Sequence, residues 1–317
     1  MSELTKLPSK LQITYATFGL MDLHNARALF DLLDCSQATK SDYKARVKQV
    51  IDYLKEHELT DDKKLTKNCL INYKKSLANN NKISVATKNK QLMTAKRFLQ
   101  ILYNASLIPF DATTDITGRQ IKGFSQSKKH KKYGLKTSEV EAICQYLQTS
   151  QDTRLKAILS LLIYQGMRLI EISRLDIEDF DVKHMSLRVL GKGKDDKEAI
   201  RLHKQTATAL TDYIKASQLK TGAMFVSQSN NSTGKRLSKT SIYMLVKGLL
   251  NELNIDNACH GFRHHFITAL IDNGFELMRV IKLSRHTSID MMQVYYDEVN
   301  DIERADELLN SLKFEVV

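Results

Sequence analysis

The scarcity of proline constrains the fold of this chain more than any other feature of its sequence. The 317 residues include two prolines and no tryptophan, and long segments repeat apolar residues every three to four positions, as amphipathic helices do. Ser84 is a good N-cap for one of these segments. Four of them in the first third of the chain are expected to form a small helical bundle: residues 23–33, 39–57, 66–78 and 84–105.

The periodicity fails between Pro109 and about Tyr133 and resumes from Lys136. Two short β-type runs, Ser186–Leu190 and Glu198–Leu202, flank the turn GKGKDDK and predict a hairpin. Further helices are expected over residues 238–253, 261–272, 277–283, 288–299 and 302–312. The sequence therefore predicts a mainly α fold with a small antiparallel β-sheet. Its expected parts are a helical domain (residues 1–115), a basic linker (116–133) and a second domain (134–317) that ends in a C-terminal helix.

The charge of the chain favours a polyanionic partner. Lys and Arg number 48 against 36 Asp and Glu, a net charge of +12, which indicates nucleic acid before membrane; a basic protein with no such partner is the alternative. The expected linker carries six of these cations between Arg119 and Tyr133 and no acid. It either crosses a phosphate backbone or is a solvated charge run. The DNA-binding candidates in it are Arg119, Lys122, Lys128, Lys129, Lys131 and Lys132.

Cysteine usage and hydropathy bear on the compartment. The four cysteines are scattered without metal-binding spacing, so we expect reduced thiols with neither zinc nor disulfides. No N-terminal apolar signal region and no run near the roughly 18 apolar residues of a membrane helix are present. We therefore expect a cytoplasmic protein without a membrane partner.

The segment YQGMRLIEISRLD places a cation at the start of a helix. Gly166 is expected to end one helix and Arg168 to open the next. Glu171, one turn further on, is placed to orient the guanidinium. An arginine held there can bind two phosphate oxygens; the alternative is an ordinary surface ion pair between Arg168 and Glu171.

The segment HGFRHHF places an imidazole beside a guanidinium. His260 and Arg263 are three residues apart and share one face of a helix. Such a pair suits an anion, since arginine neutralises charge while histidine moves a proton. Adjacent side chains on a helix point about 100° apart, so at most one of His264 and His265 faces the same site.

The segment RHTSIDMMQVYYDE offers two tyrosines. On a helix over residues 288–299, Tyr296 falls on the apolar stripe, whereas Tyr295 lies off it and is expected to be free to reach a substrate. Most tyrosines at such positions belong to the core or the surface. A phenol with a pKa near 10 is a poor nucleophile unless cations surround it.

Taken in order, these residues resemble the catalytic set of tyrosine recombinases of the phage-integrase type. The motifs of the family are a glycine, a residue and an arginine, then a hairpin lysine, an HxxR box, a histidine, and a tyrosine nine residues later. The matching residues are Arg168, Lys192, His260, Arg263, His286 and Tyr295, with Glu171 at the family's acidic position. One departure is visible, because the family's usual LGH triplet reads SRH here and Arg285 replaces glycine. Arg285 either shifts His286 or adds a phosphate contact.

The resemblance covers nearly the whole chain and implies its function. Residues from about 135 onward resemble the catalytic domain, and residues from about 15 to 110 the helical core-binding domain of the SAM-like kind. It implies a site-specific recombinase or integrase, closest in size to Xer-type and simple transposon-type enzymes. Such an enzyme works on double-stranded DNA without metal, ATP or other cofactor, as a tetramer. Its place would be the cytoplasm, associated with the nucleoid.

The resemblance also implies a role for each residue. Tyr295 attacks a phosphodiester and forms a 3′-phosphotyrosyl intermediate, while Arg168 and Arg263 stabilise the phosphate. Lys192 protonates the leaving oxygen, with Lys194 or Lys197 as alternatives. His260 handles the tyrosine proton, His286 donates to the phosphate, and Glu171 supports Arg168. Two alternative functions remain, a catalytically inactive DNA-binding regulator of the same fold and a type IB topoisomerase-like relaxing enzyme.

Overall fold

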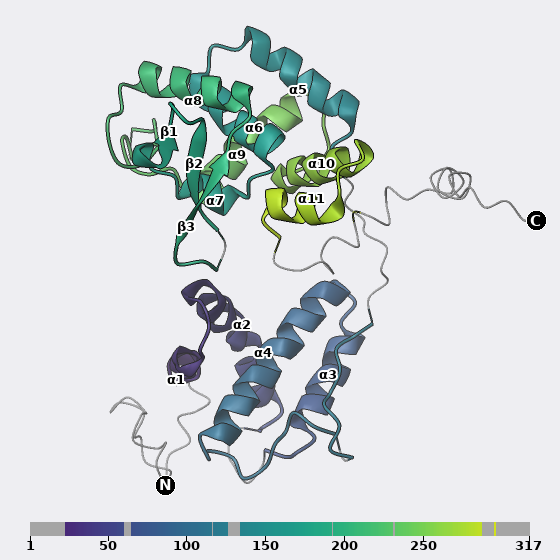
Figure 1. Ribbon diagram of the computed structural model, residues 1–317. Helices are drawn as coiled ribbons and strands as arrows, with labels where there is room; N and C mark the ends of the chain where they lie inside the picture. The colour runs from purple at the N-terminus through teal and green to yellow at the C-terminus, as the bar shows by residue number, and fades with distance from the viewer. Residues whose placement is uncertain are drawn as a thin grey trace, which may run out of the picture. The chain divides into compact units, whose positions relative to one another are not determined.

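The computed structural model divides the chain into two compact units, residues 1–129 and 130–317. Helices account for most of the described residues in both units (Figure 1), so the prediction of a mainly α protein with a small antiparallel sheet is confirmed. The residues that the structure describes are 23–59, 65–115, 117–125, 134–191, 193–230, 232–286 and 295. The helices expected over 302–312 and over nearly all of 288–299 lie outside this set.

The first unit is a helical bundle. It consists of α1 (Leu23–Leu29), a 3-10 turn (Phe30–Leu32), α2 (Gln37–Glu56), α3 (Cys69–Asn79) and α4 (Val85–Asn104). The Ser84 hydroxyl accepts a hydrogen bond from the Thr87 amide, at 3.2 Å, and caps α4 as predicted. Phe30 and Phe98 are completely buried at the centre of the bundle. The apolar stripes of the four segments therefore form one core, as their spacing indicates.

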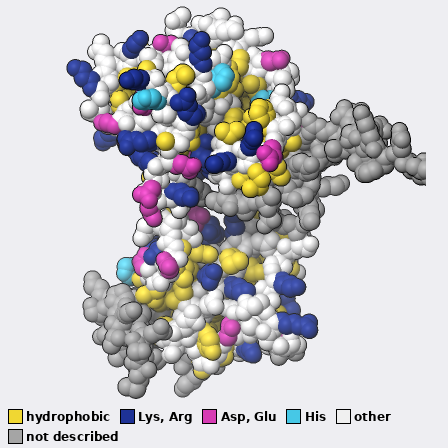
Figure 2. Space-filling view, viewed as in Figure 1, with side chains coloured by type: hydrophobic (Ala, Val, Ile, Leu, Met, Phe, Trp, Pro, Cys, Tyr) yellow, Lys and Arg dark blue, Asp and Glu magenta, His cyan; other side chains and the backbone are white. Residues whose placement is uncertain are grey.

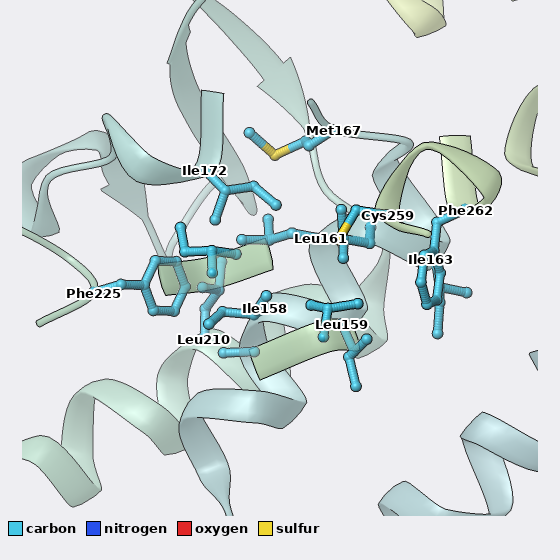
Figure 3. Packing of buried hydrophobic residues seen from close by; sticks show 14 of the residues in the cluster. Ile158, Leu159, Leu161, Ile163, Met167, Ile172, Leu210, Phe225, Cys259 and Phe262 are labelled. Carbon is cyan, nitrogen blue, oxygen red and sulfur yellow. The ribbon is translucent and has the colours of Figure 1, made fainter. Parts of the chain in front are cut away.

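The second unit begins with α5 (Thr137–Thr149), α6 (Thr153–Gln165) and the short helix α7 (Leu169–Ser173). Helix α6 is buried on nearly all sides, which makes it the centre of the core. Figure 3 shows Ile158 and Leu161 of α6 in the middle of the cluster, between Phe225 and Phe262. The ends of such a helix are held firmly, and its C-terminal end leads into the candidate site.

A three-stranded antiparallel sheet follows, with the order β1 (Phe180–Asp181), β2 (Ser186–Leu190) and β3 (Lys197–Arg201). Leu187 pairs with Phe180 on one side and with Ile200 on the other. The predicted hairpin is β2–β3. Strand β1 was not predicted, because two residues are too few to show an alternating pattern.

The chain continues through α8 (Lys204–Ser217), α9 (Lys239–Glu252), α10 (Cys259–Asp272) and α11 (Leu277–Ser284). Helices α10 and α11 lie against each other (Figure 1). Cys69 and Cys259 are buried, and all four cysteines are free thiols. No helix in the described part of the chain has the length and apolar character needed to cross a membrane.

Candidate active site

The junction between α6 and α7 sets the position of the first arginine. Gly166 ends α6 in the left-handed conformation (φ 53°, ψ 32°), and a Cβ there would lie 2.4 Å from the Phe266 ring. Glycine is therefore required both by the turn and by the close approach of α10. Arg168 is the N-cap of α7, which confirms the prediction that Gly166 ends one helix and Arg168 opens the next.

Arg168 is paired with a buried carboxylate. The backbone N–H of Arg168 donates to Glu171 Oε2 and its Nη1 to Oε1, each at 2.9 Å. Glu171 has no exposed surface, so the alternative of a surface ion pair is wrong. Burial alone raises the pKa of Glu171, but the charge of Arg285 and the hydrogen bonds from Arg168 hold it below its usual value. The carboxylate therefore stays ionised and orients the guanidinium.

The second arginine, Arg263, lies on α10 and is 1% exposed. Its Nη1 donates to the carbonyl of Gly166 at 2.7 Å, and its Nη2 donates to the carbonyl of Ser284. Burial, and then the charges of Arg168 and Arg285, lower the pKa of Arg263 to about 9. The guanidinium is thus still protonated at neutral pH.

The guanidinium groups of Arg168 and Arg263 both bind backbone carbonyls at the C-terminal end of α11. The carbonyl of Arg285 accepts from both Nη atoms of Arg168, at 3.2 and 3.3 Å, next to the Ser284 carbonyl that Arg263 binds. The last carbonyls of a helix lack partners within it and carry partial negative charge, which favours cations. Arg263 therefore connects the ends of α6 and α11, which are far apart in the sequence, and Arg168 binds the end of α11 as well.

His286 follows directly after this end. Its backbone N–H donates to the carbonyl of Ile281 at 3.1 Å, and its Nδ1 lies 2.7 Å from the Ser284 hydroxyl. Nη2 of Arg263 lies 3.3 Å from Nε2. Burial, followed by the charges of Arg263 and Arg168, lowers the pKa of His286 to about 4. The imidazole is therefore neutral at pH 7.

Tyr295 is buried beside this cluster. It is 7% exposed and packs with Ile267, Ile271 and Val280, and its ring centroid lies 5.9 Å from that of His286. The expectation that Tyr295 stands clear of the apolar core was wrong. The stripe argument considered one segment alone, whereas residues of α10 and α11 supply apolar contacts to Tyr295. Tyr296 lies outside the described residues.

The histidines of α10 have separate places. His260 is exposed in the first turn, and its charge is among those that lower the pKa of His286. The His264 ring lies 4.7 Å from the Tyr295 ring, whereas His265 Nδ1 lies 2.9 Å from the carbonyl of Leu135. Of the two adjacent histidines only His264 lies beside Tyr295, which agrees with the expectation that at most one of them faces the site. The sequence did not identify which, because the choice depends on where Tyr295 packs.

The candidate lysines differ in their surroundings. Lys192 lies outside the described residues. Lys194 is exposed on the hairpin, whereas Lys197 Nζ binds Asp179 at 2.6 Å and Asp176 at 3.0 Å. Both carboxylates belong to the segment that leads into β1, so Lys197 fastens the hairpin to the rest of the sheet. An open hollow of about 470 Å³ beside it is lined mostly by charged side chains, including those of Arg174 and Arg236.

The basic segment is described only in part. Arg119 and Lys122 are exposed, and the other four candidates, Lys128, Lys129, Lys131 and Lys132, lie outside the described residues. Asn89 of α4 holds the segment on the first unit, since its Oδ1 accepts from the Phe124 amide at 2.7 Å and its Nδ2 donates to the Phe124 carbonyl at 3.0 Å. Lys and Arg side chains are spread over the face that Figure 2 shows. In the described part of the chain, no group of three or more His, Cys, Asp or Glu could hold a metal ion.

Comparison with known proteins gives consistent matches. The model of the phage integrase family matches residues 134–301. Tyrosine recombinase XerD of Staphylococcus epidermidis is 27% identical over 281 residues, which cover 82% of this chain and 88% of that protein. Tyrosine recombinase XerC of Roseiflexus castenholzii is 33% identical over 156 residues, 46% of this chain and 48% of that one.

Two solved structures have a similar fold. The XerH site-specific recombinase bound to a palindromic difH substrate, a post-cleavage complex, has a TM-score of 0.66 at 17% identity, over 93% of this chain and 84% of that one. The Tn1549 transposon integrase in complex with circular intermediate DNA has a TM-score of 0.65 at 16% identity, over 92% of this chain and 98% of that one.

Proposed function

The chain belongs to the phage integrase family, since the family's model covers more than half of it, and on that premise we propose that it cuts and rejoins double-stranded DNA at a specific site through Tyr295. The enzyme is a tyrosine recombinase. The observation that supports the role of Tyr295 best is the meeting of Arg168, Arg263 and His286 at the end of α11, with the Tyr295 ring beside His286.

The chemistry that we propose is transfer of a phosphodiester to a phenol and back. The Tyr295 oxygen forms a bond to phosphorus while the bond from phosphorus to the 5′-oxygen breaks, which leaves a 3′-phosphotyrosyl link and a 5′-hydroxyl. Attack of the 5′-hydroxyl of another strand reverses these steps. Because the covalent link conserves the phosphate ester, rejoining consumes no ATP.

The two arginines supply the charge that this step needs. A pentacoordinate phosphorus carries more negative charge on its non-bridging oxygens than the phosphodiester does, and donors fixed in advance stabilise it most. Arg168 and Arg263 are fixed by carbonyl and carboxylate oxygens. His286, neutral at pH 7 because its pKa is about 4, acts as a hydrogen-bonding group rather than as a further cation. His260 accepts the proton of the tyrosine.

The leaving 5′-oxygen takes its proton from Lys192 in this proposal. Lys197 is less suited, because Asp176 and Asp179 hold its ammonium group and raise its pKa against the opposing effect of burial. Replacing Lys192 by Ala should slow cleavage by at least about 100-fold, the usual contribution of a general acid, and leave DNA binding nearly intact. Lys194→Ala, two residues away, is the matched control, and equal rates for the two variants would remove Lys192 from the mechanism.

The DNA would be held by both units. XerH and the Tn1549 integrase were solved as complexes with DNA, and by analogy the helical first unit serves as the core-binding domain. The exposed cations Arg119 and Lys122, with the lysines that follow them, contact phosphates. The C-terminal segment, which carries seven acidic and two basic residues between Asp297 and Val317, docks on a neighbouring protomer in a tetramer that joins two duplexes. The protein acts in the cytoplasm, in association with the nucleoid.

The test is a trapped covalent adduct. The binding site is first recovered by selection from randomised duplexes with the full-length protein, and a nicked duplex is built on it so that a short product diffuses away after cleavage. The wild type and Tyr296→Phe should form an adduct, and Tyr295→Phe should form none. DNA binding without any adduct would leave the inactive regulator, and an adduct with supercoil relaxation but no strand exchange would leave the topoisomerase-like enzyme.

A further inference from the structure

Arg285 takes the place of a glycine in the family's usual triplet, and its backbone has the conformation that glycine adopts readily. It ends α11 in the left-handed region (φ 56°, ψ 45°), where glycine has no steric cost. Other non-glycine residues of the chain, such as Met185 and Gln218, also have positive φ. The backbone conformation therefore does not distinguish Arg285 from these residues, whereas the contacts of its side chain do.

The guanidinium of Arg285 turns inward instead of reaching solvent. The side chain is 9% exposed. Nη1 donates to the carbonyl of Leu283 at 3.1 Å, and Nη2 lies 3.4 Å from the carbonyl of Gln165 and 3.1 Å from Glu171 Oε2. The side chain thus connects the end of α11 with the end of α6 and with the carboxylate on α7.

Glu171 is consequently shared by two arginines. Oε1 binds the guanidinium of Arg168, and Oε2 binds both the Arg168 amide and the guanidinium of Arg285. The carbonyl of Arg285 also accepts from the Arg168 guanidinium. Arg285 therefore holds Arg168 in two ways, directly through its carbonyl and indirectly through Glu171.

The charges of these groups give the arrangement a consequence for phosphate binding. The Glu171 carboxylate lies 2.9 Å from Arg168, and its negative charge weakens the electrostatic attraction between Arg168 and a phosphate. A second guanidinium on the same carboxylate offsets this loss, and carbonyl oxygens hold a guanidinium without a full opposing charge. The more Glu171 is neutralised by Arg285, the more of the Arg168 charge remains for an anion.

We propose that Arg285 is a positioning residue for cleavage: its guanidinium neutralises Glu171, so that Glu171 orients Arg168 without cancelling its charge toward the scissile phosphate. This inference rests on the proposed function. It differs from both effects expected of Arg285 from the sequence, a shift of His286 or a direct phosphate contact, because it places the action of the guanidinium on Glu171.

The pKa shifts agree with this geometry. Against the effect of burial, the charge of Arg285 comes first among the influences that lower the pKa of Glu171. Among the described residues, the charged groups that act on this carboxylate are Arg168, Arg263 and Arg285. Within the same part of the chain, those that act on His286 are these three arginines and His260. Removing the charge of Arg285 therefore raises the pKa of Glu171 and of His286 together.

The test compares Arg285→Gly with Arg285→Lys in single-turnover cleavage of the nicked duplex. Glycine keeps the backbone conformation and the carbonyl but removes the guanidinium. We expect cleavage to slow by about 10- to 100-fold, a loss typical of removing a side chain that orients a residue of the active site. Binding of the intact duplex should stay within about threefold. Lysine keeps the charge and should restore part of the rate.

The pH profile separates this role from a merely structural one. In Arg285→Gly the acidic limb of the cleavage rate should move to higher pH, because Glu171 and His286 are both protonated more easily, whereas in Arg285→Lys it should stay in place. The double variant Glu171→Gln, Arg285→Gly should lose little more activity than the worse single variant, since both substitutions act on one contact. If Arg285→Lys were inactive and the acidic limb of its pH profile were shifted, the proposal would be contradicted, because lysine keeps the charge. This comparison remains valid even if the glycine variant failed to fold.

Three results would overturn the inference. These are a wild-type rate and pH profile in Arg285→Gly, additive losses in the double variant, and weakened duplex binding as the main effect. Each of them requires that the wild type form its adduct, so each leaves the proposed function intact. Absence of an adduct in the wild type would instead refute the proposed function, and this inference with it.

Discussion

Two clusters of charged side chains lie in the second unit, and their charges are balanced in different ways. At the end of α11, the guanidiniums of Arg168, Arg263 and Arg285 surround one carboxylate, Glu171. Most of their hydrogen bonds go to backbone carbonyls. None of these side chains is more than 23% exposed, and among the described residues of the cluster positive charge exceeds negative charge.

At the base of the β2–β3 hairpin, two cations are paired with carboxylates. Lys197 binds both Asp176 and Asp179, and Arg236 binds Asp176 as well as the backbone carbonyls of Ser173 and Leu175. Their side chains are partly exposed, 27% for Lys197 and 42% for Arg236. Charge is nearly balanced here, and water screens what remains.

The difference indicates what each cluster is for. Carbonyl oxygens hold a guanidinium in place but do not neutralise its charge. Burying such a charge is unfavourable, which agrees with the lowered pKa of Arg263. Carboxylates neutralise the cations that they bind. An excess of buried positive charge is expected where an anion binds, whereas a balanced cluster is expected where a scaffold is fastened.

The largest difference between the clusters should appear in cleavage. Arg263→Lys keeps one charge but loses the fork that reaches the Gly166 and Ser284 carbonyls together. We expect the single-turnover rate to fall by about 100- to 1,000-fold, as after loss of one preorganised donor. Arg236→Lys makes the same chemical change in the hairpin cluster and should alter the rate by less than about threefold. Equal losses would mean that both clusters act on the phosphate.

A second contrast concerns glycines at the two places. Gly166 and Gly193 both have positive φ, 53° and 74°, but a Cβ would strike the Phe266 ring only at Gly166 and would meet nothing within 4 Å at Gly193. Gly166→Ala should therefore lower the free energy of unfolding by about 3 kcal/mol, from backbone strain together with overpacking. Gly193→Ala should lower it by about 1 kcal/mol, from strain alone. Urea unfolding measures both, and similar values would show that α10 yields easily at the site.

The sequence predicted those parts of the fold that depend on local patterns. The bounds of β2 agree with the predicted Ser186–Leu190, and Ser84 caps α4, because alternation and capping are properties of short segments. Strand β1 was missed, since its pairing with β2 depends on a partner and not on its own sequence.

The candidate site, like the fold, was predictable only where local sequence patterns determine it. Local chemistry singled out Arg168 and Arg263, and the family resemblance added His286; the structure brings all three to the end of one helix. The burial of Tyr295 and the inward course of Arg285 were not predictable. Both depend on contacts between segments far apart in the chain, such as that of Arg285 with Gln165 across 120 residues.

The smallest expected effect tests whether the hairpin cluster is a scaffold. Lys197→Met removes the cation between Asp176 and Asp179 and should lower the free energy of unfolding at pH 7 by about 1–2 kcal/mol, after discounting for partial exposure. Arg188→Ala is the matched control, since that side chain is 57% exposed and 3.5 Å from Asp179. It should change stability by less than about 0.5 kcal/mol.

The pH dependence of the Lys197→Met effect follows from the signs of the two shifts. Burial raises the pKa of Asp176, but the hydrogen bonds from Arg236 and Lys197 lower it by more, so the net shift is downward. The stabilising contribution of Asp176 is therefore present above its unfolded pKa near 4 and is lost as pH falls below that value. The pKa of Lys197 is raised, so its contribution is lost only as pH rises beyond its ordinary value near 10.5. The difference in unfolding free energy between wild type and Lys197→Met should thus be constant from about pH 5 to 9 and shrink in acid. A difference that persists at pH 2 would show that Lys197 stabilises the hairpin by packing rather than by charge.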